Sequence, residues 1–170
     1  MATSKRGSWS IDQLAKSEFF HQKLHEWELM EVARQIDQVK GETLNWQKAS
    51  LDISDKAWDK VIHRGIKPVI VFAHPDVLMN ISRSTSYYRM LAMVSQKSMN
   101  QVSLSTVRYE KGYFPKFEIA EAIAKHLNKI TSKLVEADEA IDAREFDLWR
   151  GMAAGSQAQG SWQNTKGRKV

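Results

Sequence analysis

The fold class of this sequence is decided by residues 118–147, which read EIAEAIAKHLNKITSKLVEADEAIDAREFD. Apolar side chains recur along this segment every three or four residues, which is the spacing of one face of an α-helix. The pattern predicts a long amphipathic helix that packs against a hydrophobic core. Its apolar stripe is formed by Ile119, Ile123, Leu127, Ile130, Leu134 and Ile141.

Two further helices are predicted before this segment. Ser10 and Gln13 match a capping box, whose side chains hydrogen-bond backbone N–H groups of the first turn, and they begin a long helix that runs to Gly41. Ser54 begins a shorter helix that ends at Gly65, because glycine readily adopts the left-handed conformation that follows many helices. The sequence therefore predicts a mainly α fold.

Two short stretches favour extended structure instead. Residues 68–73, PVIVFA, are rich in β-branched side chains and are bounded by turn residues, which predicts a strand or a buried extended segment. Residues 104–114 alternate around a Lys-Gly turn and predict a short β-hairpin. The domain is thus expected to be helical with one small hairpin.

The composition limits the classes of protein to consider. The 170 residues include no cysteine, which excludes disulfides and thiolate metal sites and favours a reducing compartment. The N-terminus lacks the apolar region of a secretory signal, and no apolar run approaches the roughly 20 residues of a membrane-spanning helix. We expect a cytoplasmic protein with no membrane partner.

The net charge of +5 is unevenly distributed. Segment 61–116 holds eight basic residues against only Asp76 and Glu110, whereas the segments on either side are acidic. Segment 150–170 is basic again and holds no acid. Such alternation indicates that two basic stretches share a surface that faces a polyanion, and the alternative is ordinary surface variation.

The composition changes sharply after Trp149, and this predicts two units. Residues 1–149 would form a helical DNA-binding domain, and 150–170 a basic, Gly- and Gln-rich tail or linker. Trp162 in the tail docks it onto another domain or stacks on a nucleotide. Two other tryptophans, Trp27 and Trp58, lie within helical apolar patterns, and we expect both in the core.

The helical segment 82–101, SRSTSYYRMLAMVSQKSMNQ, is the most informative part of the sequence for function. A continuous helix would place Tyr87, Leu91 and Val94 against the core. Arg, Gln, Asn and Ser side chains pair with base edges or phosphates, and no Asp or Glu lies between Val77 and Arg108. The side of the helix opposite Tyr87, Leu91 and Val94 carries the stripe of candidate contacts, and the alternative is that this stripe is an ordinary solvated polar face. The stripe is formed by Ser82, Ser86, Arg89, Met93, Gln96 and Asn100.

No catalytic motif of a self-sufficient enzyme is present. His21 and His25 have the spacing of two metal ligands on one helix, but a third ligand and the His-Glu-x-x-His pattern are missing. Asp76 follows Pro75 as in a nuclease motif, yet no lysine has an acid two positions before it, so Asp76 is interpreted as turn chemistry. Nucleophile-elbow, phosphate-loop and dinucleotide-binding patterns are also absent.

Residues 58–78, WDKVIHRGIKPVIVFAHPDVL, and 86–102, SYYRMLAMVSQKSMNQV, together with the tail 155–170, resemble the front portion of type II restriction endonucleases of the XcyI kind, in the PD-(D/E)xK superfamily. The resemblance implies a magnesium-dependent enzyme that cleaves both strands of a short palindrome as a homodimer. Tyr88 and Lys97 are among the family-like positions, as is Arg89. It also implies that the catalytic core would begin beyond Val170.

We therefore predict the DNA-binding front portion of a site-specific restriction endonuclease, without catalytic or metal-binding residues of its own. The partner would be double-stranded DNA, and magnesium would be needed only by the full-length enzyme. One alternative is a non-enzymatic interaction or regulatory module that docks a partner through 118–147 and the tail; another is a metal hydrolase built on His21 and His25. The predicted DNA contacts are Ser82, Arg83, Ser86, Arg89, Gln96, Lys97, Asn100, Arg108, Lys166, Arg168 and Lys169.

Overall fold

The structure is a computed structural model, which describes residues 25–137, and within this range the chain is helical and contains no strand. The mainly α prediction is therefore confirmed. Residues 25–37 are helical and precede the short 3-10 helix η1. The elements are η1 (Gly41–Thr43), α3 (Asp55–His63), α4 (Pro68–Val71), α5 (Pro75–Asn80), α6 (Ser84–Leu91), α7 (Gln96–Gln101), α8 (Val107–Glu110) and α9 (Phe117–Ala137).

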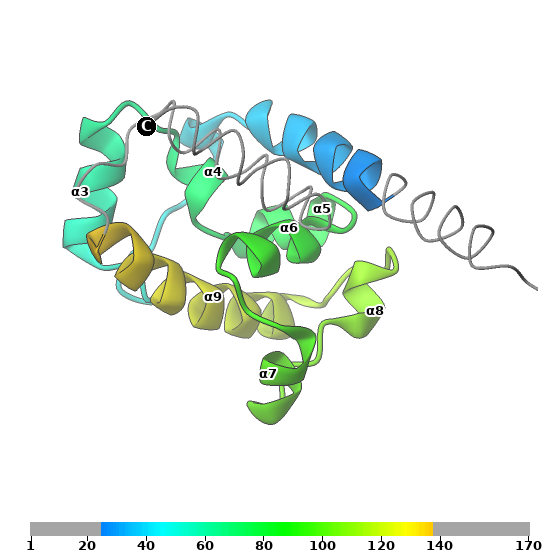
Figure 1. The fold of residues 1–170 in the computed structure, drawn as a ribbon. Coiled ribbons are helices and arrows are strands. Elements are labelled where there is room, and N and C mark those ends of the chain that lie inside the picture. Colours follow the sequence, from blue (N-terminus) through cyan, green and yellow to red (C-terminus); the bar gives the residue numbers. More distant parts are fainter. Residues whose placement is uncertain (1–24, 138–170) are drawn as a thin grey trace, which may run out of the picture.

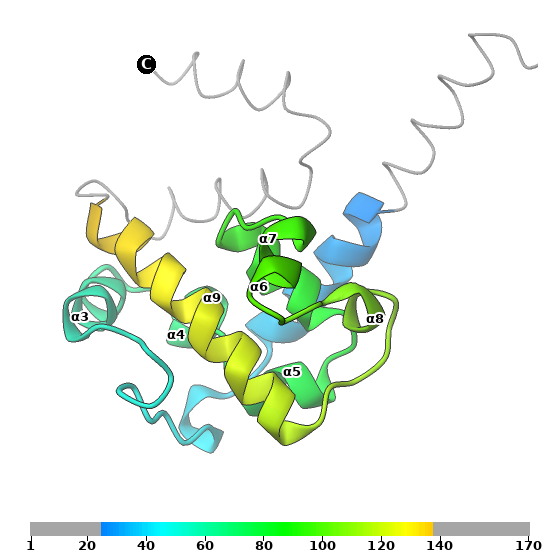
Figure 2. The ribbon, with the colours of Figure 1, turned by 90° about the horizontal axis from the view of Figure 1, so that it is seen from below.

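Helix α9 is the central packing element of the described chain. It runs along one side of the molecule and contacts α3, α5 and α6 (Figure 1), and Figure 2 shows its length from below. The predicted apolar stripe is confirmed at Ile123 and Leu127, but Ile119 is 40% exposed. Residues 138–147 lie outside the described residues. The buried face is Ala120, Ile123, Ala124, Leu127, Asn128, Thr131, Ser132 and Val135.

The polar residues on this buried face hold neighbouring segments against α9. The Asn128 side chain accepts a hydrogen bond from the Ala73 N–H at 2.7 Å and donates one to the Ala73 carbonyl at 2.8 Å. Both backbone groups of Ala73 are thus satisfied, as a strand partner would satisfy them. On α3, the Lys60 ammonium donates to the Val135 carbonyl at 2.9 Å. Polar contacts therefore set the position of the long helix.

The strand or buried extended segment predicted over 68–73 is wrong for residues 68–71, which form the short helix α4, whereas Phe72 is extended and buried. Pro68 occupies the first turn, where its fixed φ suits a helix and its missing N–H costs nothing. The hydroxyl of Tyr87 donates to the Ile70 carbonyl at 2.7 Å, and the Tyr88 hydroxyl donates to Val69. Tyrosine hydroxyls thus take the place of the neighbouring strand that these carbonyls would otherwise need.

The hairpin predicted over 104–114 is also wrong. This stretch contains the one-turn helix α8, preceded by Ser103 at φ 60° and followed by Gly112 at φ 110°. Because residues 107–110 are helical, this stretch does not supply the two paired strands of a hairpin. The alternating pattern reflects instead which side chains of a compact loop face the core.

The start of α3 is as predicted. The Ser54 hydroxyl accepts a hydrogen bond from the Ala57 N–H at 3.1 Å, and Gly65 follows the helix at φ 76°. Trp58 is half-buried and packs on the core, stacked on Phe72 at 6.1 Å between ring centroids. Trp27, however, is 70% exposed, so its predicted place in the core is wrong.

We expect Asn128→Ala to lower the free energy of unfolding by about 3 kcal/mol, because the buried N–H and carbonyl of Ala73 would both lose their partner. Urea denaturation followed by far-UV circular dichroism measures this. Lys129→Ala, an exposed neighbour on the same helix, is the control and should change stability by less than about 0.5 kcal/mol. Equal effects of the two substitutions would contradict the assigned role of Asn128.

Candidate nucleic-acid interface

The predicted polar stripe over 82–101 is wrong, because two helices replace the single one. Helix α6 ends at Leu91, and α7 begins only at Gln96. Between them Met93 has φ 61°, and the Ser95 hydroxyl accepts a hydrogen bond from the Ser98 N–H at 3.0 Å as an N-cap. A good N-cap begins a new helix where the pattern alone would continue the old one.

Most of α6 is inside the molecule. Tyr87, Leu91 and Val94 lie in the core, which confirms the predicted packing side. Ser86, on the predicted polar side, is only 4% exposed. The residues of α6 that were expected to face DNA thus have little surface to offer it.

Arg89 and Glu110 form a shielded ion pair that joins α6 to α8. The Arg89 guanidinium donates to both carboxylate oxygens, at 2.6 and 2.8 Å, and to the Val94 carbonyl at 2.7 Å. The two side chains are 14% and 9% exposed. Such bidentate pairs are strong and directional. The guanidinium therefore has an internal partner, and a DNA contact by Arg89 stays an untested prediction.

The environment of Glu110 lowers its pKa below the ordinary value. Burial by itself raises the pKa, but the hydrogen bonds from Arg89 and Thr106 and the charge of Arg89 outweigh it. The carboxylate of the folded chain is thus held in its charged form at neutral pH, where it needs the guanidinium as its partner.

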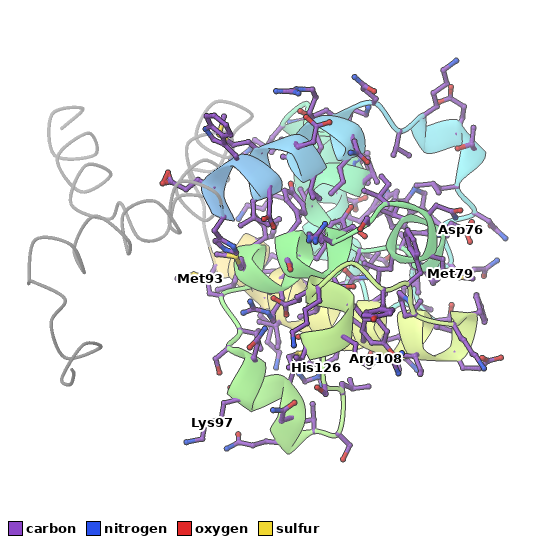
Figure 3. The ribbon with its side chains drawn as sticks, turned by 90° about the vertical axis from the view of Figure 1, so that its right-hand side faces the viewer. Asp76, Met79, Met93, Lys97, Arg108 and His126 are labelled. Atoms are coloured by element: carbon purple, nitrogen blue, oxygen red, sulfur yellow. The ribbon has the colours of Figure 1, made fainter. Side chains whose placement is uncertain are left out.

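Helix α7 is the most exposed of the predicted contact segments. Met99 is fully buried, while the other five residues of the helix are exposed. Helix α7 projects from the body below α9 (Figure 1), and the Lys97 side chain points away from the molecule (Figure 3). One methionine thus attaches a short helix whose remaining side chains face solvent. These side chains are Gln96, Lys97, Ser98, Asn100 and Gln101.

Ser82 and Arg83 precede α6 and contact the loop after α8. Arg83 has the left-handed backbone (φ 63°, ψ 12°), and its guanidinium donates to the Lys111 carbonyl at 3.3 Å. It also lies 3.5 Å from a carboxylate oxygen of Glu28. The Ser82 hydroxyl donates to the Gly112 carbonyl at 3.5 Å. These predicted DNA contacts therefore have structural partners.

A pocket of about 260 Å³ lies between the helical residues 25–37 and α6, α7 and α8. It brings together three predicted site residues from separate elements, Arg83, Ser86 and Gln96. The sequence gave no indication that the carboxylates of Glu28 and Glu110 would line the same pocket, because these two residues are distant from each other in the chain. The remaining lining residues are His25, Glu28, Leu29, Val107, Glu110 and Lys111.

A line of lysines on α9 was missed by the sequence analysis. Lys125, Lys129 and Lys133 recur every fourth residue, so they lie on one face of the helix, and all three are exposed. The spacing of the three lysines was sufficient to predict a basic face on this helix. It was overlooked because the segment as a whole has a net negative charge and its apolar stripe is the more prominent pattern.

Several predicted positions lie outside the described residues. Among residues 25–137, no group of three or more His, Cys, Asp and Glu side chains could hold a metal ion. Asp76 lies exposed in the first turn of helix α5 rather than in the predicted turn, and its backbone N–H donates to the ring of His74, the N-cap of that helix, at 3.1 Å. The undescribed positions are Ser10, Gln13, His21, Ile141, Trp162, Lys166, Arg168 and Lys169.

Comparisons with known proteins gave no relative: no family model, no curated protein and no solved structure matches this chain. In the part of the chain that the structure describes, no helix combines the length and the apolar character needed to cross a membrane. Any functional conclusion therefore depends on the residues and their geometry.

The ion pair makes stability depend on pH. Because the folded pKa of Glu110 is lowered, its contribution is fully present above the unfolded pKa and is lost as the pH falls through the folded one. We expect Glu110→Gln to cost about 2 kcal/mol at pH 7 and progressively less below about pH 4.5. Urea unfolding across this range measures the difference.

The exposed Glu118 provides the matched control, since Glu118→Gln removes the same charge near the same part of the chain. Its effect at pH 7 should stay within about 0.5 kcal/mol of zero. A Glu110→Gln cost that stays constant on acidification would contradict the assignment of a lowered pKa.

Proposed function

We propose that this chain binds duplex DNA as the front portion of a type II site-specific restriction endonuclease, with no cleavage centre of its own. The observation that carries the DNA-binding part is helix α7. Its exposed surface consists of amide, hydroxyl and ammonium groups around Lys97, and it carries no acid. Amide side chains can pair with base edges, and lysine with phosphates.

The dimensions of a helix such as α7 suit a groove. An α-helix with its side chains is about 10–12 Å in diameter, and the major groove of B-form DNA is about 12 Å wide and admits one. Because Met99 alone is buried, the projecting helix can enter the groove while the body stays outside. Gln96 and Asn100, one turn apart, are the proposed base contacts.

The surroundings of α7 favour an anionic partner. No acidic residue occurs between Val77 and Tyr109, and Glu110 is paired with Arg89. Arg108 on α8 is exposed and lies toward the viewer in Figure 3, the same view in which Lys97 projects. Lys125, Lys129 and Lys133 on α9 are three further exposed cations. These cations would provide most of the affinity, through phosphate contacts.

The restriction endonuclease part of the proposal is supported by the resemblance of 57–102 to enzymes of the XcyI kind. Magnesium and a homodimer would belong to the full-length enzyme. Residues 25–137 offer no cluster that fits a magnesium site, so no step of strand cleavage is assigned to them. The lack of cysteine supports action in a reducing cytoplasm.

A protein-interaction module is the second candidate, and one observation favours it. Trp27 is 70% and Met30 55% exposed, one turn apart on the helical residues 25–37. Large apolar side chains in that arrangement commonly contact another protein. A module of this kind would bind DNA no more tightly than its modest net charge explains.

Fluorescence anisotropy of the full chain on labelled random duplex DNA tests the proposal. We expect affinity to fall steeply with salt, with a slope equivalent to about three or more phosphates. Lys97→Ala should lower affinity about three- to tenfold and reduce that slope by about one, because one phosphate contact is lost.

Lys56→Ala is the matched control, because Lys56 is equally exposed but lies on α3, away from α7. Its effect on DNA affinity should be less than twofold. The DNA-binding proposal fails if the chain does not bind duplex DNA at low salt, or if Lys97→Ala and Lys56→Ala behave alike. If the chain does not bind DNA but associates with itself or with a partner protein, and Trp27→Ala abolishes that association, the interaction module would be favoured.

A further inference from the structure

We infer that the loop between α8 and α9, together with the first residue of α9, is a stacking platform for unpaired nucleic-acid bases. The aromatic platform consists of Tyr113, Phe114 and Phe117. This inference deepens the proposed function and rests on the chain binding nucleic acid, but it concerns another element and another form of the ligand than the groove contact of α7.

The three rings are exposed although they are large and apolar. Tyr113 is 60%, Phe114 53% and Phe117 47% exposed, within five consecutive residues. Burial of one such ring stabilises a protein by about 1.5–3 kcal/mol, so a chain that leaves three together in solvent forgoes a substantial gain. Grouped exposed aromatic side chains of this kind mark a binding surface.

The backbone that carries the rings is held in place by hydrogen bonds. The Tyr113 N–H donates to the Arg108 carbonyl at 3.3 Å, and Arg83 and Ser82 donate to the carbonyls of Lys111 and Gly112. Pro115, between the rings, is buried. The rings are therefore presented by an ordered loop, which lowers the entropy that binding would cost.

Close packing at Gly112 adds a further constraint. A Cβ atom at this position would lie 3.5 Å from the Arg83 guanidinium, and the φ of 110° is one that side chains other than glycine rarely adopt. The guanidinium thus packs directly on the loop backbone. The loop conformation is thus fixed by contacts with the residues that precede α6, while the three rings are exposed to solvent.

The charges around the platform select the kind of partner. Three exposed cations, Arg108, Lys111 and Lys116, lie before and between the rings in the sequence, against one exposed carboxylate, Glu118, directly after Phe117. Exposed aromatic rings among cations fit a ligand with flat apolar faces and negative charge, which describes nucleic-acid bases on their phosphate backbone. A purely apolar protein partner would gain nothing from the three cations.

Arg108 connects the two kinds of contact. Its guanidinium lies 5.1 Å from the centroid of the Tyr113 ring, in a cation–π arrangement. The Arg108 side chain is exposed, and a guanidinium can donate hydrogen bonds to a phosphate. A base stacked on the platform would therefore have a cation beside its own phosphate.

The bases must be unpaired. In an intact duplex each base face is covered by its neighbours, so an aromatic side chain can stack only on a single strand or on an opened step. Helix α7 suits a groove of paired DNA, whereas the platform suits bases released from pairing. One surface would thus grip a duplex and the other a strand separated from it.

Anisotropy of the full chain on a labelled single-stranded oligothymidylate tests the inference. The reference ligand is an abasic oligonucleotide of the same length, which keeps the phosphates and lacks the bases. We expect the oligothymidylate to bind at least about tenfold more tightly. Phe114→Ala should remove most of this preference, while affinity for the abasic strand stays unchanged.

Two further variants separate stacking from simple apolar contact. Phe114→Leu keeps an apolar side chain but no ring and should lose the preference, whereas Phe114→Trp should keep it. Ile62→Ala, which shortens an exposed apolar residue on α3, is the matched control and should change nothing. Retention of the preference by Phe114→Leu would overturn the stacking role.

The outcomes distinguish this inference from the proposed function. Equal affinity for the two strands, with duplex binding still dependent on Lys97, would overturn the platform and leave the duplex grip intact. Absence of binding to every nucleic acid would overturn both. A chain whose Phe114→Ala variant alters only sedimentation, and not oligonucleotide affinity, would use the platform to contact a second copy, and the inference would be wrong.

Discussion

The ion pair between Arg89 and Glu110 determines how the candidate surfaces are placed. The same guanidinium also donates to the Val94 carbonyl, in the turn that leads to α7. One side chain of α6 therefore fixes both the beginning of the projecting helix and, through α8, the loop that carries the aromatic rings. Because the pair is shielded from water, loss of either partner would leave the other charge poorly solvated and without a counter-charge. The placement of both surfaces therefore depends on both side chains of the pair.

Much of the fold could be predicted from local patterns, because helix caps and apolar periodicity act over a few residues. The Ser54 cap, Gly65 and the apolar positions Ile123 and Leu127 all matched the structure. The buried Asn128 could not be predicted, because its value depends on Ala73, which is remote in sequence and approaches only after folding. The predicted core position of Trp27 was wrong for a related reason: periodicity shows that one face of a helix is apolar, but not whether other parts of the molecule cover that face.

The candidate site was less predictable than the fold. Lys97 was expected on an exposed surface and lies there, but Arg89 has an internal partner. A sequence shows that an arginine offers hydrogen-bond donors, but it does not show whether a carboxylate of the same folded chain accepts hydrogen bonds from them. The separation of α6 from α7 depends on Ser95 and on the left-handed Met93, whose conformation a periodicity argument ignores. The aromatic platform was hidden because its residues resembled one strand of a hairpin.

The attachment of α7 through Met99 alone has a consequence for how such a chain can change over generations. Five of the six side chains in the helix make no contribution to the core, so substitutions at these positions should change the free energy of unfolding very little. Chemical variety can accumulate on the projecting helix while the scaffold beneath remains constant. New binding preferences can therefore arise by single amino-acid replacements, without the loss of stability that usually limits the evolution of a binding surface.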